Sequence, residues 1–296
     1  EMLLHKHKQH HHHALSAWDP FHQDKMYIKT MQLVKDPPQN SIIEDAKTAG
    51  FTAITWAWST LKTAVGAKIM QAAEEFEPDH TPWILHAGFP IMEEDAKLNG
   101  KQVAWPNAIH YQYGIDHVPV RQMEVCFLIG KADDPNWHVV AEAFGIVVNH
   151  VAKKYAHHEF PLDMTCESRF TRASESTMAN CYHEDAKNQL AFYIEVVSRS
   201  TNKLWKSFAS ELGTAWKELG KKFNVPCTFH WAKDIPKPND EKFMKEWISE
   251  RFGPRIPKFH EVREKYVGKN NLFANMWLRD MLDIPTEGAK TAHPSQ

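Results

Sequence analysis

From residue 120 onward, stretches with the two-residue period of a strand alternate with stretches that have the period of a helix, and this alternation constrains the fold most. Apolar residues recur at every second position in Val120–Ile129 and in Leu162–Phe170. A helical period follows Asp134 and returns from Ser200 to Gly220. Further strands are predicted at 25–34, 190–197 and 227–231, and further helices at 42–76, 241–251, 259–266 and 275–282. This order predicts an α+β fold in which helices cover a largely antiparallel sheet.

The same periods predict which side chains are buried. The inner face of the strand that starts at residue 120 is predicted to hold Met123, Val125, Phe127 and Ile129. Asp134 is predicted to cap the next helix, with Pro135 at its first position. The buried side of that helix is predicted to hold Val140, Phe144, Val147, Val148, Val151 and Tyr155. The helix at 200–220 is predicted to bury Leu204, Phe208, Leu212, Trp216 and Leu219.

Composition and charge exclude several classes of protein. The chain has 296 residues, of which 43% are hydrophobic, as in folded proteins. Lys and Arg number 35 against 37 Asp and Glu, so a nucleic-acid partner is not expected. The sequence has no run of 18 apolar residues, so no transmembrane segment is expected. It also has no Gly-rich phosphate loop of the Rossmann or P-loop type.

The cysteines and histidines do not predict a metal site. Cys126, Cys166, Cys181 and Cys227 include no CxxC pair, which argues against a zinc ribbon or a thioredoxin-like motif. Two disulfides remain open from the sequence. The His-rich residues 5–13 can bind transition metals without a biological purpose, so we predict no metal ligand there.

Two groups of charged residues are candidates for chemistry. Glu167 and Arg169 lie two residues apart, so they share one face of their predicted strand. They either bind one ligand together or form a solvated ion pair of little energetic value. Lys233 follows His230 and Trp231, where it is either a buried cation near a reacting centre or a lysine whose ammonium reaches solvent. The pattern by itself leaves both alternatives open.

Five segments, taken in order, resemble one family. They are 18–28 (WDPFHQDKMYI), 120–129 (VRQMEVCFLI), 160–170 (FPLDMTCESRF, with its Glu-x-Arg), 229–233 (FHWAK) and 259–278 (FHEVREKYVGKNNLFANMWL). Together they resemble the C-terminal half of the aldonolactone oxidases, which include the arabinonolactone oxidases and the alditol oxidases. This group belongs to the vanillyl-alcohol-oxidase/p-cresol-methylhydroxylase flavoprotein superfamily. The sequence departs from the family pattern at Ala232, where the family has Gly, and at Val267-Gly268, where it has Asp-Pro.

The resemblance implies a substrate-binding cap domain of an FAD-dependent oxidase or dehydrogenase. Such an enzyme oxidises a sugar lactone or a polyol by hydride transfer to flavin N5. Glu167 and Arg169 would hold or polarise substrate hydroxyl groups, and Lys233 would stabilise developing negative charge. His230, Trp231 and Asn275 would line the cofactor side. The resemblance also implies that FAD is held mainly by a domain that is not in this chain.

The expected organisation has three parts. These are a His-rich segment at 1–17, a cap domain at 18–258 and a segment at 259–296 that would pack back on a flavin domain. Two hypotheses follow. The chain is one part of a split flavin oxidase, or it is a non-catalytic protein that binds a hydrophobic ligand, a pigment or a partner chain on a cap-domain scaffold. The expected partners are a flavin-domain chain or another copy of this chain, together with a small-molecule substrate.

Overall fold

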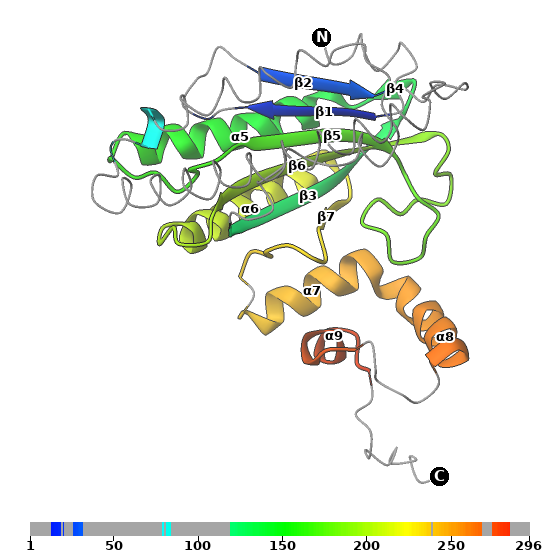
Figure 1. Cartoon of the computed structure of the whole chain (residues 1–296). Coiled ribbons are helices and arrows are strands. Elements are labelled where there is room, and N and C mark those ends of the chain that lie inside the picture. The colour runs from blue at the N-terminus through cyan, green and yellow to red at the C-terminus, as the bar shows by residue number, and fades with distance from the viewer. Residues whose placement is uncertain are drawn as a thin grey trace, which may run out of the picture.

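Antiparallel pairing organises the described part of the chain, which in this computed structural model is residues 13–18, 20, 26–31, 79, 81–83, 119–237, 239–267 and 274–284. The described strands form a seven-stranded sheet in the order β2-β1-β5-β6-β3-β4, and β7 also pairs with β3 (Figure 1). They are β1 His13–Trp18, β2 Met26–Met31, β3 Val120–Lys131, β4 Asp134–Pro135, β5 Cys166–Arg172, β6 Gln189–Arg199 and β7 Cys227–Phe229. Every pair of neighbouring strands is antiparallel, which confirms the predicted α+β class. The predicted helix at 42–76 lies outside the described residues.

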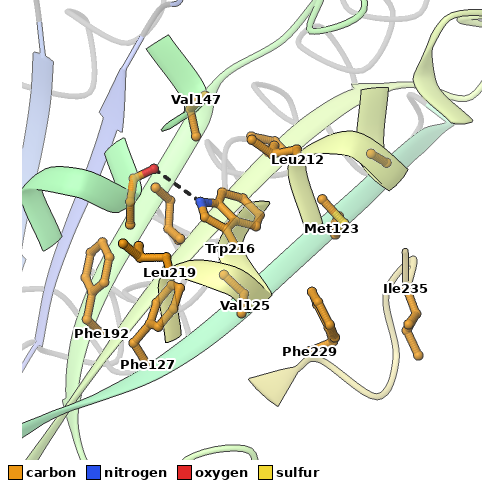
Figure 2. Close-up of a cluster of buried hydrophobic side chains, with 14 of the residues drawn as sticks. Met123, Val125, Phe127, Val147, Phe192, Leu212, Trp216, Leu219, Phe229 and Ile235 are labelled. Carbon is orange, nitrogen blue, oxygen red and sulfur yellow. Dashed lines mark hydrogen bonds between the residues drawn. The ribbon is translucent and has the colours of Figure 1, made fainter. Parts of the chain in front are cut away.

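Two long helices cover one face of the sheet. They are α5 Trp137–Tyr155 and α6 Trp205–Phe223, and they pack against each other (Figure 1). The predicted inner face of β3 is confirmed, because Met123, Val125, Phe127 and Ile129 are fully buried there. Figure 2 shows the ring of Trp216 among these side chains, with its indole N–H donating to the backbone oxygen of Ala143 at 3.1 Å. This cluster is the main hydrophobic core.

The predicted start of the first long helix is wrong. Asp134 and Pro135 form β4, paired with Lys131 and Gly130 of β3, and α5 begins only at Trp137. A tight reversal makes this pairing, and Gly130 at its start has φ +98°, a conformation that glycine adopts without strain. The Asn136 N–H then donates to the Ile129 carbonyl at 2.6 Å. The Asp-Pro pair therefore completes a strand reversal before the helix begins.

The predicted buried stripe of α5 is confirmed only in part, at Val147 and Val151. Val139, Ala143, Val147 and Val151 are buried, whereas Val140, Phe144 and Val148 lie half-buried beside them. Tyr155, predicted to be buried, is 51% exposed. The predicted stripe of α6 is confirmed apart from Leu204, which precedes the helix and is exposed. The helical period was correct in both cases, but the angle at which each helix meets the sheet selects its buried face.

The remaining helices lie beyond β7 (Figure 1). They are α7 Glu241–Phe252, the short 3-10 turn η3 Gly253–Arg255, α8 Ile256–Val267 and α9 Met276–Met281. The Trp247 ring of α7 contacts Phe229 of β7 edge to face, with ring centroids 5.6 Å apart. β1 spans the predicted domain boundary between residues 17 and 18, and α8 spans the predicted boundary between residues 258 and 259. The division into domains itself stays a prediction.

The structure also bears on two features considered from the sequence, disulfide bonds and membrane-spanning helices. All four cysteines are free thiols, so neither disulfide left open by the sequence is formed. Among the helices of the described segments, none combines the length and the apolar character that crossing a bilayer requires.

Candidate active site

The centre of the candidate site is Glu124, a carboxyl group buried in the middle of β3. Arg169 Nη2 donates to Glu124 Oε1 at 2.7 Å, and Lys233 Nζ donates to Oε2 at 2.8 Å. Two of the three residues predicted to be catalytic therefore converge on one carboxylate, although 45 and 109 residues separate them from it. A buried carboxylate that accepts from two cations is a strong, directional arrangement.

Strand register brings the acidic residues into one row. Glu124 of β3 lies opposite Glu195 of β6, which lies opposite Glu167 of β5. Alternation along β3 places Glu124 on the sheet face away from α5 and α6, because Met123 and Val125 face those helices. We call Glu124, Glu195, Glu167, Arg169 and Lys233 the polar row.

Arg169 is held in place by its neighbour on β6. It lies opposite Tyr193, and its guanidinium carbon is 4.6 Å from the centroid of that ring, a cation–π contact. Tyr193 in turn packs with Cys126 and Cys181 in a small apolar cluster on the same face. This packing restricts the arginine side chain, so that its guanidinium is already directed at Glu124 before any ligand binds.

The backbone after β7 positions Lys233. The His230 N–H donates to the Glu124 carbonyl at 3.0 Å, and the Asp234 N–H donates to the Gln122 carbonyl at 2.7 Å, so this segment continues along β3. The Asp234 carboxylate accepts from Arg121 Nε at 2.9 Å and from the Trp205 indole N–H at 2.7 Å. The lysine is thus fixed from both sides of its position in the chain.

The pKa values of Glu124 and Glu195 are shifted in opposite directions. Burial alone would raise the pKa of Glu124, but Lys233 and Arg169 outweigh it and lower that pKa. Burial raises the pKa of Glu195 to about 8, with Lys233 opposing the shift and Glu124 adding to it. Lys233 Nζ lies 2.6 Å from Glu195 Oε1, so one ammonium serves two carboxyl groups. Burial acts against the charge of Arg169, yet Glu124 raises the pKa of that guanidinium.

The structure places the other predicted residues around this centre. Glu167 is half-buried in the row and accepts from the Thr165 hydroxyl at 3.2 Å. His230 is half-buried, its Nδ1 accepts from the Ala232 N–H at 3.2 Å, and burial lowers the pKa of its ring. Asn275 caps α9 by accepting from the Leu278 N–H at 2.8 Å.

A hollow of about 630 Å³ adjoins the polar row. It brings together three of the predicted residues, Trp231, Lys233 and Asn275. The Trp231 ring contacts that of Trp277 at 5.9 Å, and its indole N–H donates to the Met178 carbonyl at 3.0 Å. The described residues that line the hollow are Val120, Arg121, Gln122, Trp231, Ala232, Lys233, Asp234, Ile235, Asn275 and Trp277. Lys233 belongs to both the hollow and the polar row.

Sequence reasoning missed Glu124 and Glu195 as site residues. Each is the single acidic residue in the middle of a strand that is otherwise largely apolar. An ionisable residue at such a position is costly unless it is paired, so each carried a usable signal. Within the described residues, no three His, Cys, Asp or Glu side chains are grouped in a way that could hold a metal ion.

Comparison with known proteins shows the fold. No protein-family model and no curated protein sequence matches the chain. Among solved structures, the cholesterol oxidase from B. sterolicum matches with a TM-score of 0.65 and 14% sequence identity, over 91% of this chain and 53% of that one. A histidine-to-alanine variant of the Brevibacterium sterolicum cholesterol oxidase matches with a TM-score of 0.53 and 16% identity, over the same shares.

The chain therefore has a fold found in cholesterol oxidases and spans about half of their length. At this level of identity the likeness concerns the fold alone. Both of these solved structures are cholesterol oxidases and not aldonolactone oxidases.

Proposed function

We propose that the chain is part of an FAD-dependent oxidoreductase that oxidises a CH–OH group of a sugar lactone or polyol. The observation that carries this proposal is the convergence of Arg169 and Lys233 on buried Glu124, beside the hollow that contains Trp231. The fold supports it, because cholesterol oxidases are FAD enzymes in the same superfamily as the aldonolactone oxidases.

The residues around the hollow fit a flavin ring. Trp231 and Trp277 offer flat aromatic surfaces, and Lys233 supplies a positive charge within the same hollow. Asn275 also lines the hollow, and its amide NH₂ group is a hydrogen-bond donor by chemistry, since the side-chain oxygen caps α9. When bound, FAD would supply the hydride acceptor that the oxidation requires.

The polar row has the chemistry to bind and activate a hydroxyl group. Arg169 and Lys233 are donors that polarise a substrate oxygen, and Glu167 is an acceptor that orients a neighbouring hydroxyl. Because the cations are held by Glu124 and by the Tyr193 ring, little reorganisation is needed when charge develops on the substrate oxygen. A substrate rich in hydroxyl groups, such as a lactone or polyol, matches this density of donors and acceptors.

The remainder of the flavin site would come from a separate or cleaved chain, or from a second copy of this chain. Large apolar side chains are exposed on the C-terminal helices, namely Val262, Tyr266 and Met276. Exposed apolar groups of this kind favour association with another protein surface. The predicted role of 259–296, packing back on a flavin domain, would use this same surface.

Binding and reduction of FAD test the proposal. The chain, co-purified with any partner, is loaded with FAD and mixed anaerobically with D-arabinono-1,4-lactone, with xylitol and with cholesterol. We expect bleaching of the flavin absorbance with the lactone or with xylitol. Lys233→Met should lower the reduction rate by about 10²-fold or more, as is typical for loss of a preorganised electrostatic group.

Lys222→Met is the matched control. Lys222 lies on the surface of α6 and pairs with Glu142 at 2.6 Å, so its loss removes a lysine and an ion pair away from the site. Its rate of flavin reduction should equal that of the parent. If the parent binds no FAD, or if cholesterol alone reduces it, the proposed reaction or its substrate class is wrong.

A second function is favoured by one observation, the aromatic cluster at the hollow. Trp231 lies within 4.5 Å of Phe252 and 5.5 Å of Trp247, measured between ring centroids. Such a cluster also suits a non-catalytic protein that binds an apolar ligand or pigment. The absorption spectrum of the natively purified protein separates the two functions, since a bound chromophore other than flavin would favour the binding protein.

A further inference from the structure

Oxidation of a CH–OH group releases a proton as well as a hydride, and the assignments above provide no acceptor for it. Arg169 and Lys233 donate hydrogen bonds to the Glu124 carboxylate, so neither is placed as a base. Glu124 accepts from both cations, and these lower its pKa, which makes it a weak proton acceptor. The proton therefore needs another group on the same face.

Glu195 occupies the middle of the polar row. It lies between Glu124 on β3 and Glu167 on β5 in the strand register, and its side chain is 12% exposed. Lys233 lies 2.6 Å from its Oε1. The other charged or titratable groups that act on it are Arg169, on β5, and the buried Cys166.

Glu195 and Glu124 share one ammonium group. Arg169 and Lys233 both contact Glu124, at 2.7 and 2.8 Å, and Lys233 also contacts Glu195, at 2.6 Å. Burial and the neighbouring Glu124 charge raise the pKa of Glu195 to about 8, which places its titration in the range where a general base is effective.

We propose that Glu195 is the catalytic residue that accepts the hydroxyl proton of the substrate. In this step the substrate O–H bond breaks and its electron pair forms the second bond of the new carbonyl group. The C–H electron pair would leave as hydride to FAD when that cofactor is bound, and the proton would convert the Glu195 carboxylate to the acid. The proposal rests on the function proposed above and adds to it the identity of the base.

Two neighbours are less suited to the role. Glu167 lies at the β5 end of the row and accepts from the Thr165 hydroxyl at 3.2 Å. His230 directs its Nδ1 at a backbone N–H, and burial lowers the pKa of its ring. Both residues serve as comparisons in the test.

The first readout does not depend on activity. Infrared titration of the flavin-free chain, with ¹³C-labelled glutamate, reports whether a carboxylic acid persists at neutral pH. We expect an acid signal that disappears with a midpoint near 8 in the parent, is absent in Glu195→Gln, and persists in Glu167→Gln. If the signal is unchanged in Glu195→Gln, the proposal is overturned.

The second readout is the pH profile of flavin reduction by the active substrate. Glu195→Gln should bind FAD as the parent does but reduce it about 10²–10⁴-fold more slowly, the range for loss of a general base. The rising limb of the profile near pH 8 should vanish. Glu195→Asp, which keeps the acid on a shorter stem, should retain a rising limb with a lower rate, and it replaces the Gln variant if that fails to fold.

The outcomes separate the two proposals. If Glu195→Gln reduces FAD at the parent rate with an unchanged pH profile, another group is the base while the proposed function stands. If the parent binds no FAD, the proposed function fails and the role of Glu195 fails with it. Glu211→Gln, an exposed change on α6 where Glu211 accepts from Ser207, controls for the loss of a carboxylate alone.

Discussion

Replacing Glu124 by glutamine tests whether the buried carboxylate holds the polar row together. Glu124→Gln keeps the shape of the side chain and removes its charge, which leaves Arg169 and Lys233 without their common partner. Removing one member of a fully buried ion pair costs about 3–5 kcal/mol. Arg169 is 34% exposed and Lys233 keeps Glu195, so solvent and the second carboxyl group recover part of that loss.

We therefore expect a loss of about 2–3 kcal/mol in the free energy of unfolding. This is less than the cost of breaking a fully buried ion pair and more than the cost of breaking a surface pair. Urea unfolding followed by tryptophan fluorescence measures it, and the slope with denaturant should not change. The matched control is Glu142→Gln, which breaks the surface pair with Lys222 and should cost under about 1 kcal/mol. Equal stability of the two variants would refute the claim that buried charge pairing organises the site.

Two further substitutions test the framework around the site. Asp163→Ala should cost about 3–5 kcal/mol, because Asp163 is buried and accepts from Ser198, Asn202 and Arg199, and its ion pair with Arg199 would be lost. A melting temperature within about 2 °C of the parent, measured by scanning calorimetry, would contradict this. Gly213→Ala should cost about 1–3 kcal/mol, because the new Cβ would lie 2.6 Å from Cγ of Pro236, and scanning calorimetry measures this loss. Gly145→Ala, with no atom near the new methyl group, is the control and should not be destabilised.

Local patterns predicted most of the regular structure. β3 and β6 were found because their apolar residues alternate or run continuously, and α6 was found because Phe208, Leu212 and Trp216 recur at helical spacing. The start of α5 was not found, because Asp-Pro also suits a strand reversal, and the pairing of β4 with β3 decided between the two. A local signal cannot choose between conformations that only a distant partner distinguishes.

Part of the candidate site was likewise predicted from the sequence, and part was not. The sequence predicted Arg169 and Lys233 as candidate catalytic residues, with Glu167 as the acid on the same strand face as Arg169. It did not identify Glu124 as their shared centre, nor Glu195 as the carboxyl group beside it. Pairing with Glu124 is what makes Arg169 and Lys233 one site, and that pairing links separate strands and a loop.

The sequence by itself determined the periodicity of each segment, the balance of charge and the residue types that the site contains. Tertiary structure alone decided which carboxyl groups stand side by side and which cations they share. The physical reason is range: side-chain alternation is set by the backbone of a single strand, whereas the row of Glu124, Glu195 and Glu167 depends on the register of three strands. The shifted pKa values of Glu124 and Glu195 follow from that register, because burial and neighbouring charge exist only once the sheet has formed.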